Sequence, residues 1–133
     1  MARQPLVLLV PEGRRTGAIT RAGLESYGYD VLTASTLEEG LDLLLMNQRV
    51  SVLVVDVEPE KVSEGMALAK AARRSDPSLH VIYTCRAPYK LPEREKVKDA
   101  PCLRTPYHPH QLVGVIGQIS SRHCFDEHEM RAA

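Results

Sequence analysis

The stretch VSVLVVD, residues 50–56, is a nearly unbroken apolar run that ends in a carboxylate. Four of its seven residues are valine and one is leucine, so it is too apolar for a strand with one face in water. Such a run is typical of a central strand in a parallel sheet that helices cover on both faces. Because ligands bind beyond the carboxyl ends of the strands in such sheets, Asp56 stands where we expect chemistry.

Four further strands are predicted around this one. Residues 6–10 form a second wholly apolar run, LVLLV, which ends at Pro11. Alternation over residues 29–34 predicts a short edge strand. Residues 79–84 and 100–104 predict the fourth and fifth strands.

Helices are predicted between these runs, where apolar residues recur at helical spacing. Within residues 14–27, one helical face carries four residues that we expect to be buried: Ile19, Ala22, Gly23 and Tyr27. The second helix begins at two overlapping capping boxes, Ser35 with Glu38 and Thr36 with Glu39. The third helix ends before Pro77, and Pro109 suits the first position of a last helix.

Residues 86–100 are the least regular part, because Pro88 and Pro92 disfavour a full helix; residues 93–99 can form two turns. Strands and helices otherwise alternate along the chain, which predicts a parallel sheet wound on both faces. We therefore expect an α/β fold of flavodoxin-like type, a doubly wound five-stranded parallel sheet in a three-layer α/β/α sandwich. The expected domain covers residues 1–121, and residues 122–133 form a polar tail.

Composition argues against several classes of function. The chain has 133 residues with 17 Lys+Arg and 17 Asp+Glu, so no net charge draws it to nucleic acid or to an anionic membrane. No apolar run approaches the roughly 20 residues needed to cross a bilayer. Three cysteines without a Cys-x-x-Cys pair suggest neither a disulfide framework nor a zinc site. We expect a cytoplasmic globular domain that binds neither nucleic acid nor membrane.

Polar residues follow the predicted strands in a recognisable order. Pro11-Glu12 comes after the first strand, Asp56 ends the third, Thr84-Cys85 ends the fourth and Thr105-Pro106 follows the fifth, while Gly65 lies near the start of the third helix. In this order and spacing the chain resembles the receiver domain of bacterial response regulators, the CheY-like phosphoacceptor module of two-component signalling. The resemblance covers about residues 5–120.

The resemblance implies a role for each of these residues. Asp56 matches the phosphoacceptor. Glu12 matches the second member of an acidic pair, and Pro11 occupies the place of the first. Cys85 falls on the Thr/Ser switch position, with Thr84 as the alternative if the strand is shifted by one residue. Thr105 replaces the usual lysine, and the resemblance implies a cis peptide bond before Pro106.

These departures predict an eroded phosphorylation site. Phosphoryl transfer to a carboxylate depends on Mg²⁺ and on positive charge around the transferring group. By resemblance, the Mg²⁺ ligands are Glu12, Asp56 and the backbone carbonyl of Glu58, which is one carboxylate fewer than usual and implies weak binding. Thr105 offers only a hydroxyl in place of an ammonium. The candidate replacement cations are Arg86 and Arg104.

We therefore expect a signalling module, not an enzyme, in which phosphorylation is weak or dispensable. Its partner would be a histidine kinase or another signalling protein. By resemblance, the contact surface and a homodimer interface lie on the face of residues 88–119, with exposed contacts from Tyr89, Leu91 and Tyr107.

Three alternatives stay open. The first is a fully functional single-domain phosphoacceptor shuttle. The second is a nucleotide or small-ligand binder of flavodoxin type, although only Gly13 follows the first strand where phosphate-binding loops use several glycines. The third gives Asp56 no function beyond capping loop amides at the end of a strand.

Overall fold

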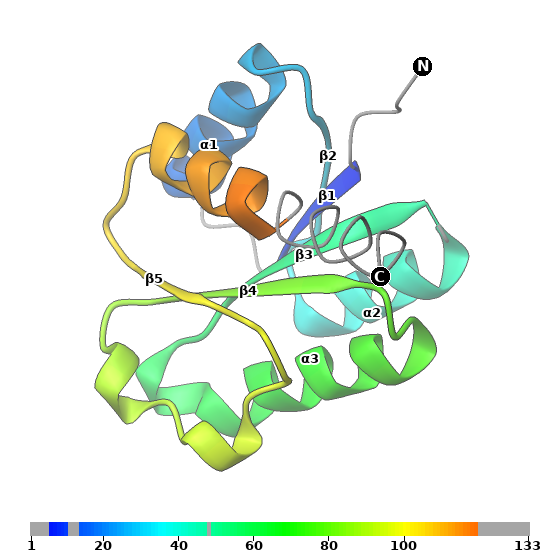
Figure 1. Cartoon of the computed structure of the whole chain (residues 1–133), viewed down its shortest axis with the longest axis vertical. Helices are drawn as coiled ribbons and strands as arrows, with labels where there is room; N and C mark the ends of the chain where they lie inside the picture. Colours follow the sequence, from blue (N-terminus) through cyan, green and yellow to red (C-terminus); the bar gives the residue numbers. More distant parts are fainter. Residues whose placement is uncertain (1–5, 11–13, 48, 120–133) are drawn as a thin grey trace, which may run out of the picture.

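A computed structural model of the chain describes residues 6–10, 14–47 and 49–119. It contains one sheet of five parallel strands in the order β2-β1-β3-β4-β5 (Figure 1). The strands are β1 (Leu6–Val10), β2 (Asp30–Thr33), β3 (Val50–Asp56), β4 (His80–Cys85) and β5 (Cys102–Arg104). The predicted flavodoxin-like doubly wound sheet is confirmed, and β5 is two residues shorter at its start than the predicted strand.

Helices cover both faces of this sheet. They are α1 (Arg14–Ser26), α2 (Leu37–Met46), α3 (Val62–Ser75) and a helix formed by residues 109–119. Helix α1 and the 109–119 helix lie side by side on one face, and α2 and α3 lie on the other (Figure 1). Among the residues that the structure describes, no helix is both long and apolar enough to cross a membrane.

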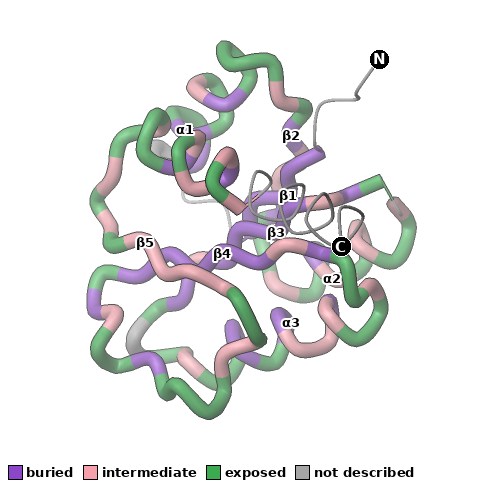
Figure 2. Tube along the Cα trace, viewed as in Figure 1, coloured by how far each residue is buried: buried purple, intermediate pink, exposed green. Residues whose placement is uncertain are grey.

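The hydrophobic core is divided between the two faces of the sheet. Leu53 and Val55 of β3 pack towards α2 and α3, whereas Val52 and Val54 pack towards α1 and the 109–119 helix. All four side chains are buried, so the purple segments of Figure 2 concentrate on the central strands. This two-sided burial explains why residues 50–56 are apolar at nearly every position.

Helix α1 buries a different face from the predicted one. Ile19 is 62% exposed and Tyr27 is 55% exposed, while Thr20 and Leu24 are buried. A Cβ atom added to Gly23 would lie 2.2 Å from Cβ of Pro109, so the two helices meet there nearly backbone to backbone. The close contact with the 109–119 helix sets which side of α1 turns inward, and the sequence of α1 alone did not reveal it.

At the start of α2, the second of the two predicted capping boxes supplies the cap. Oγ1 of Thr36 accepts a hydrogen bond from the backbone N–H of Glu39 at 3.1 Å, and Oε2 of Glu39 accepts one from the backbone N–H of Ser35 at 3.2 Å. The first bond satisfies an N–H group that the first helical turn leaves free, and the second links the residue before the N-cap to the helix.

Residues 86–100, which we call the strap, contain two short 3₁₀ helices, η2 (Pro88–Lys90) and η3 (Glu93–Glu95), and no α-helix. The expected absence of a full helix is confirmed. The two turns predicted over residues 93–99 are wrong, because the chain is already extended at Lys96.

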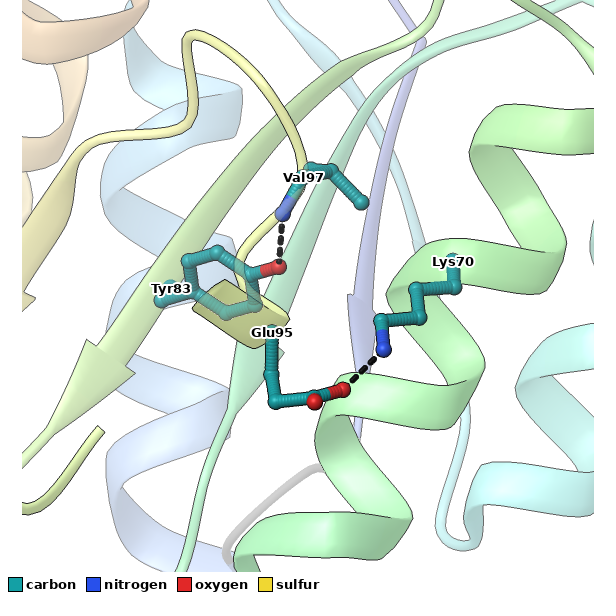
Figure 3. Close-up of polar contacts among 4 residues, drawn as sticks. All are labelled: Lys70, Tyr83, Glu95 and Val97. Atoms are coloured by element: carbon teal, nitrogen blue, oxygen red, sulfur yellow. Dashed lines mark hydrogen bonds and ion pairs between the residues drawn. The ribbon is translucent and has the colours of Figure 1, made fainter. Parts of the chain in front are cut away.

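Side chains from β4 and α3 hold the strap against the domain (Figure 3). The phenol of Tyr83 accepts a hydrogen bond from the backbone N–H of Val97 at 3.0 Å, and Arg73 donates to the carbonyl of Lys98 at 2.8 Å. Lys70 forms an ion pair with Glu95. The strap is thus fixed by side-chain contacts in place of the backbone ladder of a helix.

Candidate functional site

Asp56 and Thr84 lie next to each other at the carboxyl edge of the sheet. The register of β3 and β4 pairs the two residues directly. Oγ1 of Thr84 donates a hydrogen bond to Oδ1 of Asp56 at 2.9 Å. Cys85 instead belongs to the core cluster beneath α2 and α3, where its Sγ accepts a hydrogen bond from the backbone N–H of Ala87. Of the two residues left open by the sequence, Thr84 is the one that contacts Asp56.

Burial gives Asp56 unusual electrostatics. It raises the pKa of the Asp56 carboxyl above its usual value of 3.8, while the hydrogen bond from Thr84 acts in the opposite direction and the charge of Glu58 adds to the increase. Among the described side chains, no Lys or Arg forms an ion pair with Asp56. The described surroundings therefore disfavour the ionised form of the carboxylate.

Neither candidate replacement cation forms an ion pair with Asp56 in the part of the chain that the structure describes. Nη2 of Arg86 is 2.8 Å from Oε1 of Glu60, and both side chains are about two-thirds exposed, at 67% and 66%. This ion pair joins the loops after β3 and β4 at the surface, and it gives Arg86 an acidic partner other than Asp56. Arg104, the last residue of β5, is exposed.

The segment after β5 turns an aromatic ring inward. The backbone N–H of Thr105 donates to the carbonyl of Cys85 at 3.1 Å, and the peptide bond between Thr105 and Pro106 is cis, as expected. The phenol oxygen of Tyr107 then lies 3.4 Å from Oγ1 of Thr20 on α1. Burial raises the pKa of the Tyr107 phenol, and the charge of Asp56 raises it further.

Thr20 was missed by the sequence analysis. It is a buried hydroxyl, 3% exposed, on the face that α1 shares with Leu24. Gly17, Thr20 and Leu24 recur at helical spacing, and this pattern could have indicated the buried face of α1. The more apolar Ile19 and Tyr27 favoured the other face instead.

Several solved structures share the architecture of this chain. A response-regulator receiver protein from Sinorhizobium medicae superposes with a TM-score of 0.75 and 21% identity, covering 86% of this chain and 93% of the other. The chemotaxis protein CheY4 of Vibrio cholerae gives a TM-score of 0.74 and 23% identity, covering 86% and 98%. The chain has the receiver fold.

A third receiver-fold structure is the response regulator TrrA of Thermotoga maritima, solved in complex with Mg²⁺ and BeF. Its TM-score is 0.70 at 17% identity, and the match covers 86% of this chain and 98% of that one. Neither a protein-family model nor a curated protein sequence matches the chain. At these identities the likeness establishes the fold.

The receiver fold raises the question of a Mg²⁺ site, and the structure describes two of the three predicted ligand residues. Glu12 and Pro11 lie outside the described residues. The carbonyl of Glu58, the predicted backbone ligand, accepts a hydrogen bond from the N–H of Lys61 at 2.9 Å. Within residues 6–10, 14–47 and 49–119, no three His, Cys, Asp or Glu residues are grouped to hold a metal ion. Of the three predicted ligands, Asp56 and Glu58 belong to the described structure, and a carbonyl oxygen with one hydrogen bond keeps a second lone pair.

The three predicted contact residues, Tyr89, Leu91 and Tyr107, differ in how far they are exposed. Tyr89 on η2 is 85% exposed, as expected. Leu91 is only 4% exposed and packs into the core beneath α2 and α3, so its assignment as an exposed contact residue is wrong. Tyr107 is half-buried and turned towards Thr20. The two side chains lie on opposite faces of the sheet: Leu91 packs into the core beneath α2 and α3, and Tyr107 packs against the face that α1 and the 109–119 helix cover.

Proposed function

We propose that this chain is a receiver-type module of two-component signalling in which phosphorylation of Asp56 is weak or dispensable. One observation carries the proposal. At the carboxyl edge of the receiver fold, the Asp56 carboxylate is held by the hydroxyl of Thr84, and no described cation pairs with it.

The expected cost to phosphorylation follows from electrostatics. Catalysis of phosphoryl transfer consists mainly of positioning the group and stabilising its charge. A hydrogen bond from a charged donor contributes about 1.5–3 kcal/mol, and Thr105 stands where the resemblance places an ammonium. Losing that donor slows phosphorylation by roughly ten- to a hundredfold.

The position of Thr84 supports signalling that does not depend on phosphorylation of Asp56. Its hydroxyl already contacts Asp56, whereas in a phosphorylation switch such a hydroxyl moves to a newly added phosphoryl group. Signalling would then proceed through contacts with a histidine kinase or another signalling protein. The face of residues 88–119, where Tyr89 is the most exposed aromatic side chain, is the proposed contact surface and homodimer interface.

The variant Thr105→Lys tests the proposal by restoring the missing charge. The wild type, Thr105→Lys and Thr105→Met would be incubated with acetyl phosphate and Mg²⁺ and followed by intact mass. We expect Thr105→Lys to be phosphorylated about tenfold faster or more, since it regains a charged donor. Thr105→Met adds length without charge and should behave as the wild type, and Asp56→Asn should gain no phosphoryl group. A wild type that is phosphorylated as fast as Thr105→Lys would refute the proposal.

A further inference from the structure

Helices α2 and α3 enclose a groove of about 780 Å³ on the face opposite α1. Both helices begin at the carboxyl edge of the sheet, so the groove runs from that edge down between them. It is lined by residues of the two helices and of the loops before them: Ser35, Thr36, Leu37, Glu38, Leu41, Asp56, Glu58, Lys61, Glu64, Gly65, Ala67, Leu68 and Ala71.

The walls of the groove are apolar, and most side chains on the α3 wall are small. Leu37 and Leu41 contribute from α2, and Leu68 from α3. The α3 wall otherwise consists of small residues, Gly65, Ala67 and Ala71, of which Ala67 is exposed. Residues 65–71 extend about 9 Å along the axis of α3, nearly two helical turns. The groove is therefore long enough for nearly two turns of a helix laid along it.

Charge is concentrated at the end of the groove nearest the carboxyl edge. Four acidic residues line that end, against one Lys: Glu38, Asp56, Glu58 and Glu64 against Lys61. Among the described side chains, none of these five takes part in an ion pair. Acidic residues in a first turn stabilise a helix by themselves, but that effect does not account for the apolar walls beside them. An anionic ligand such as a nucleotide would be repelled, and an apolar ligand with a positive charge fits both features.

We propose that the α2–α3 groove binds a basic amphipathic helix of a partner protein. Apolar side chains of the helix, spaced one turn apart, pack against Leu37, Leu41 and Leu68. A Lys or Arg at its end lies beside Glu58 and Glu64. This binding needs no phosphoryl group on Asp56, so it succeeds or fails independently of the proposed function.

A labelled peptide and one pair of variants test the groove. The probe is a fluorescein-labelled amphipathic peptide of about 15 residues, with Leu on one face and Arg in the last turn. Its binding to the full chain is measured by fluorescence anisotropy in the presence of EDTA. We expect saturable binding that weakens about tenfold or more when the Arg of the peptide is replaced by Gln, because a charged hydrogen bond is lost.

The chain variants locate the site. Ala67→Arg places a bulky cation on the exposed wall of the groove and should weaken binding about tenfold or more. Ala22→Arg, at an exposed position of α1 on the opposite face, should leave binding within about twofold. Circular dichroism of both variants checks that they are folded.

Three outcomes overturn the proposal. They are no binding at about 1 mM peptide, equal binding to Ala67→Arg and wild type, or equal binding of the Arg and Gln peptides. If n-hexylguanidinium binds and Ala67→Arg abolishes this while no peptide binds, the groove takes a small organic cation and the partner helix is wrong.

Discussion

Asp56 is a half-buried carboxylate that receives one side-chain hydrogen bond from the described residues, that of Thr84. Burying a charge without a compensating partner costs free energy, and the cost appears as a raised pKa. Thr84 offsets part of that cost but supplies no positive charge. The ionised form of the Asp56 carboxyl is therefore disfavoured in the folded chain.

The raised pKa predicts the pH dependence of stability. Because the folded state binds the Asp56 proton more tightly than the unfolded chain, stability falls as the pH rises from 3.8 through the raised pKa. Asp56→Asn removes the charge and keeps an oxygen that accepts from Thr84. We expect a higher free energy of unfolding than in the wild type at about pH 7, with a difference that shrinks as the pH falls towards 3.8.

Urea unfolding at a series of pH values measures this difference. Asp42→Asn, at an exposed position of α2, is the matched control and should show no comparable trend. An Asp56→Asn variant that is less stable than the wild type at neutral pH would contradict the electrostatic account.

At the scale of the element, the strap connects β4 to β5 without an α-helix. Pro88 and Pro92 exclude an α-helix in this segment. Residues from distant parts of the chain therefore form hydrogen bonds with backbone groups of the strap. Tyr83 on β4 and Arg73 on α3 bind the backbone of residues 97 and 98. Tyr83 also precedes Thr84, so neighbouring residues of one strand contact the strap and Asp56.

Tyr83→Phe tests the anchoring of the strap. The variant removes the oxygen that accepts from the N–H of Val97 and keeps the buried ring. We expect a loss of about 1 kcal/mol in the free energy of unfolding, since the N–H loses its partner. Amide exchange at Val97 should become faster. Tyr89→Phe removes the same oxygen from a side chain that is 85% exposed and should change neither quantity.

At the scale of the whole molecule, two segments far apart in the sequence complete one layer. Helix α1 and the 109–119 helix lie side by side (Figure 1), and Gly23 meets Pro109 at their contact. Only a residue without a side chain allows this approach. The contact also helps to determine which face of α1 is buried, and with it the position of Thr20 beside Tyr107.

Gly23→Ala would force the two helices apart, because its Cβ would lie 2.2 Å from Cβ of Pro109. We expect the free energy of unfolding to fall by about 1–3 kcal/mol. Gly114→Ala, in the 109–119 helix with nothing within 4 Å of the added Cβ, should raise it by up to about 1 kcal/mol. Thermal or urea unfolding of both variants decides the matter. Equal effects of the two substitutions would mean that helix propensity, not the contact, governs position 23.

The local sequence by itself determined the order of strands and helices, the buried runs 6–10 and 50–56, and the place of Asp56 at the end of a central strand. It also predicted that residues 86–100 lack a full helix. These features depend on hydrophobic runs, prolines and helix caps, which act between residues a few positions apart. Short-range interactions therefore account for the sequence of strands and helices along the chain.

Only the tertiary structure decided which side chains meet. The side chains of Thr84 and Cys85 point to opposite faces of β4, so a shift of one residue in the register would exchange their positions. The pairing of β4 with β3 determines that Thr84 is the one that contacts Asp56. The burial of Leu91 and the inward turn of Tyr107 likewise depend on elements far away in the chain. Such contacts arise from packing between distant segments, and no local pattern in the sequence encodes the partner.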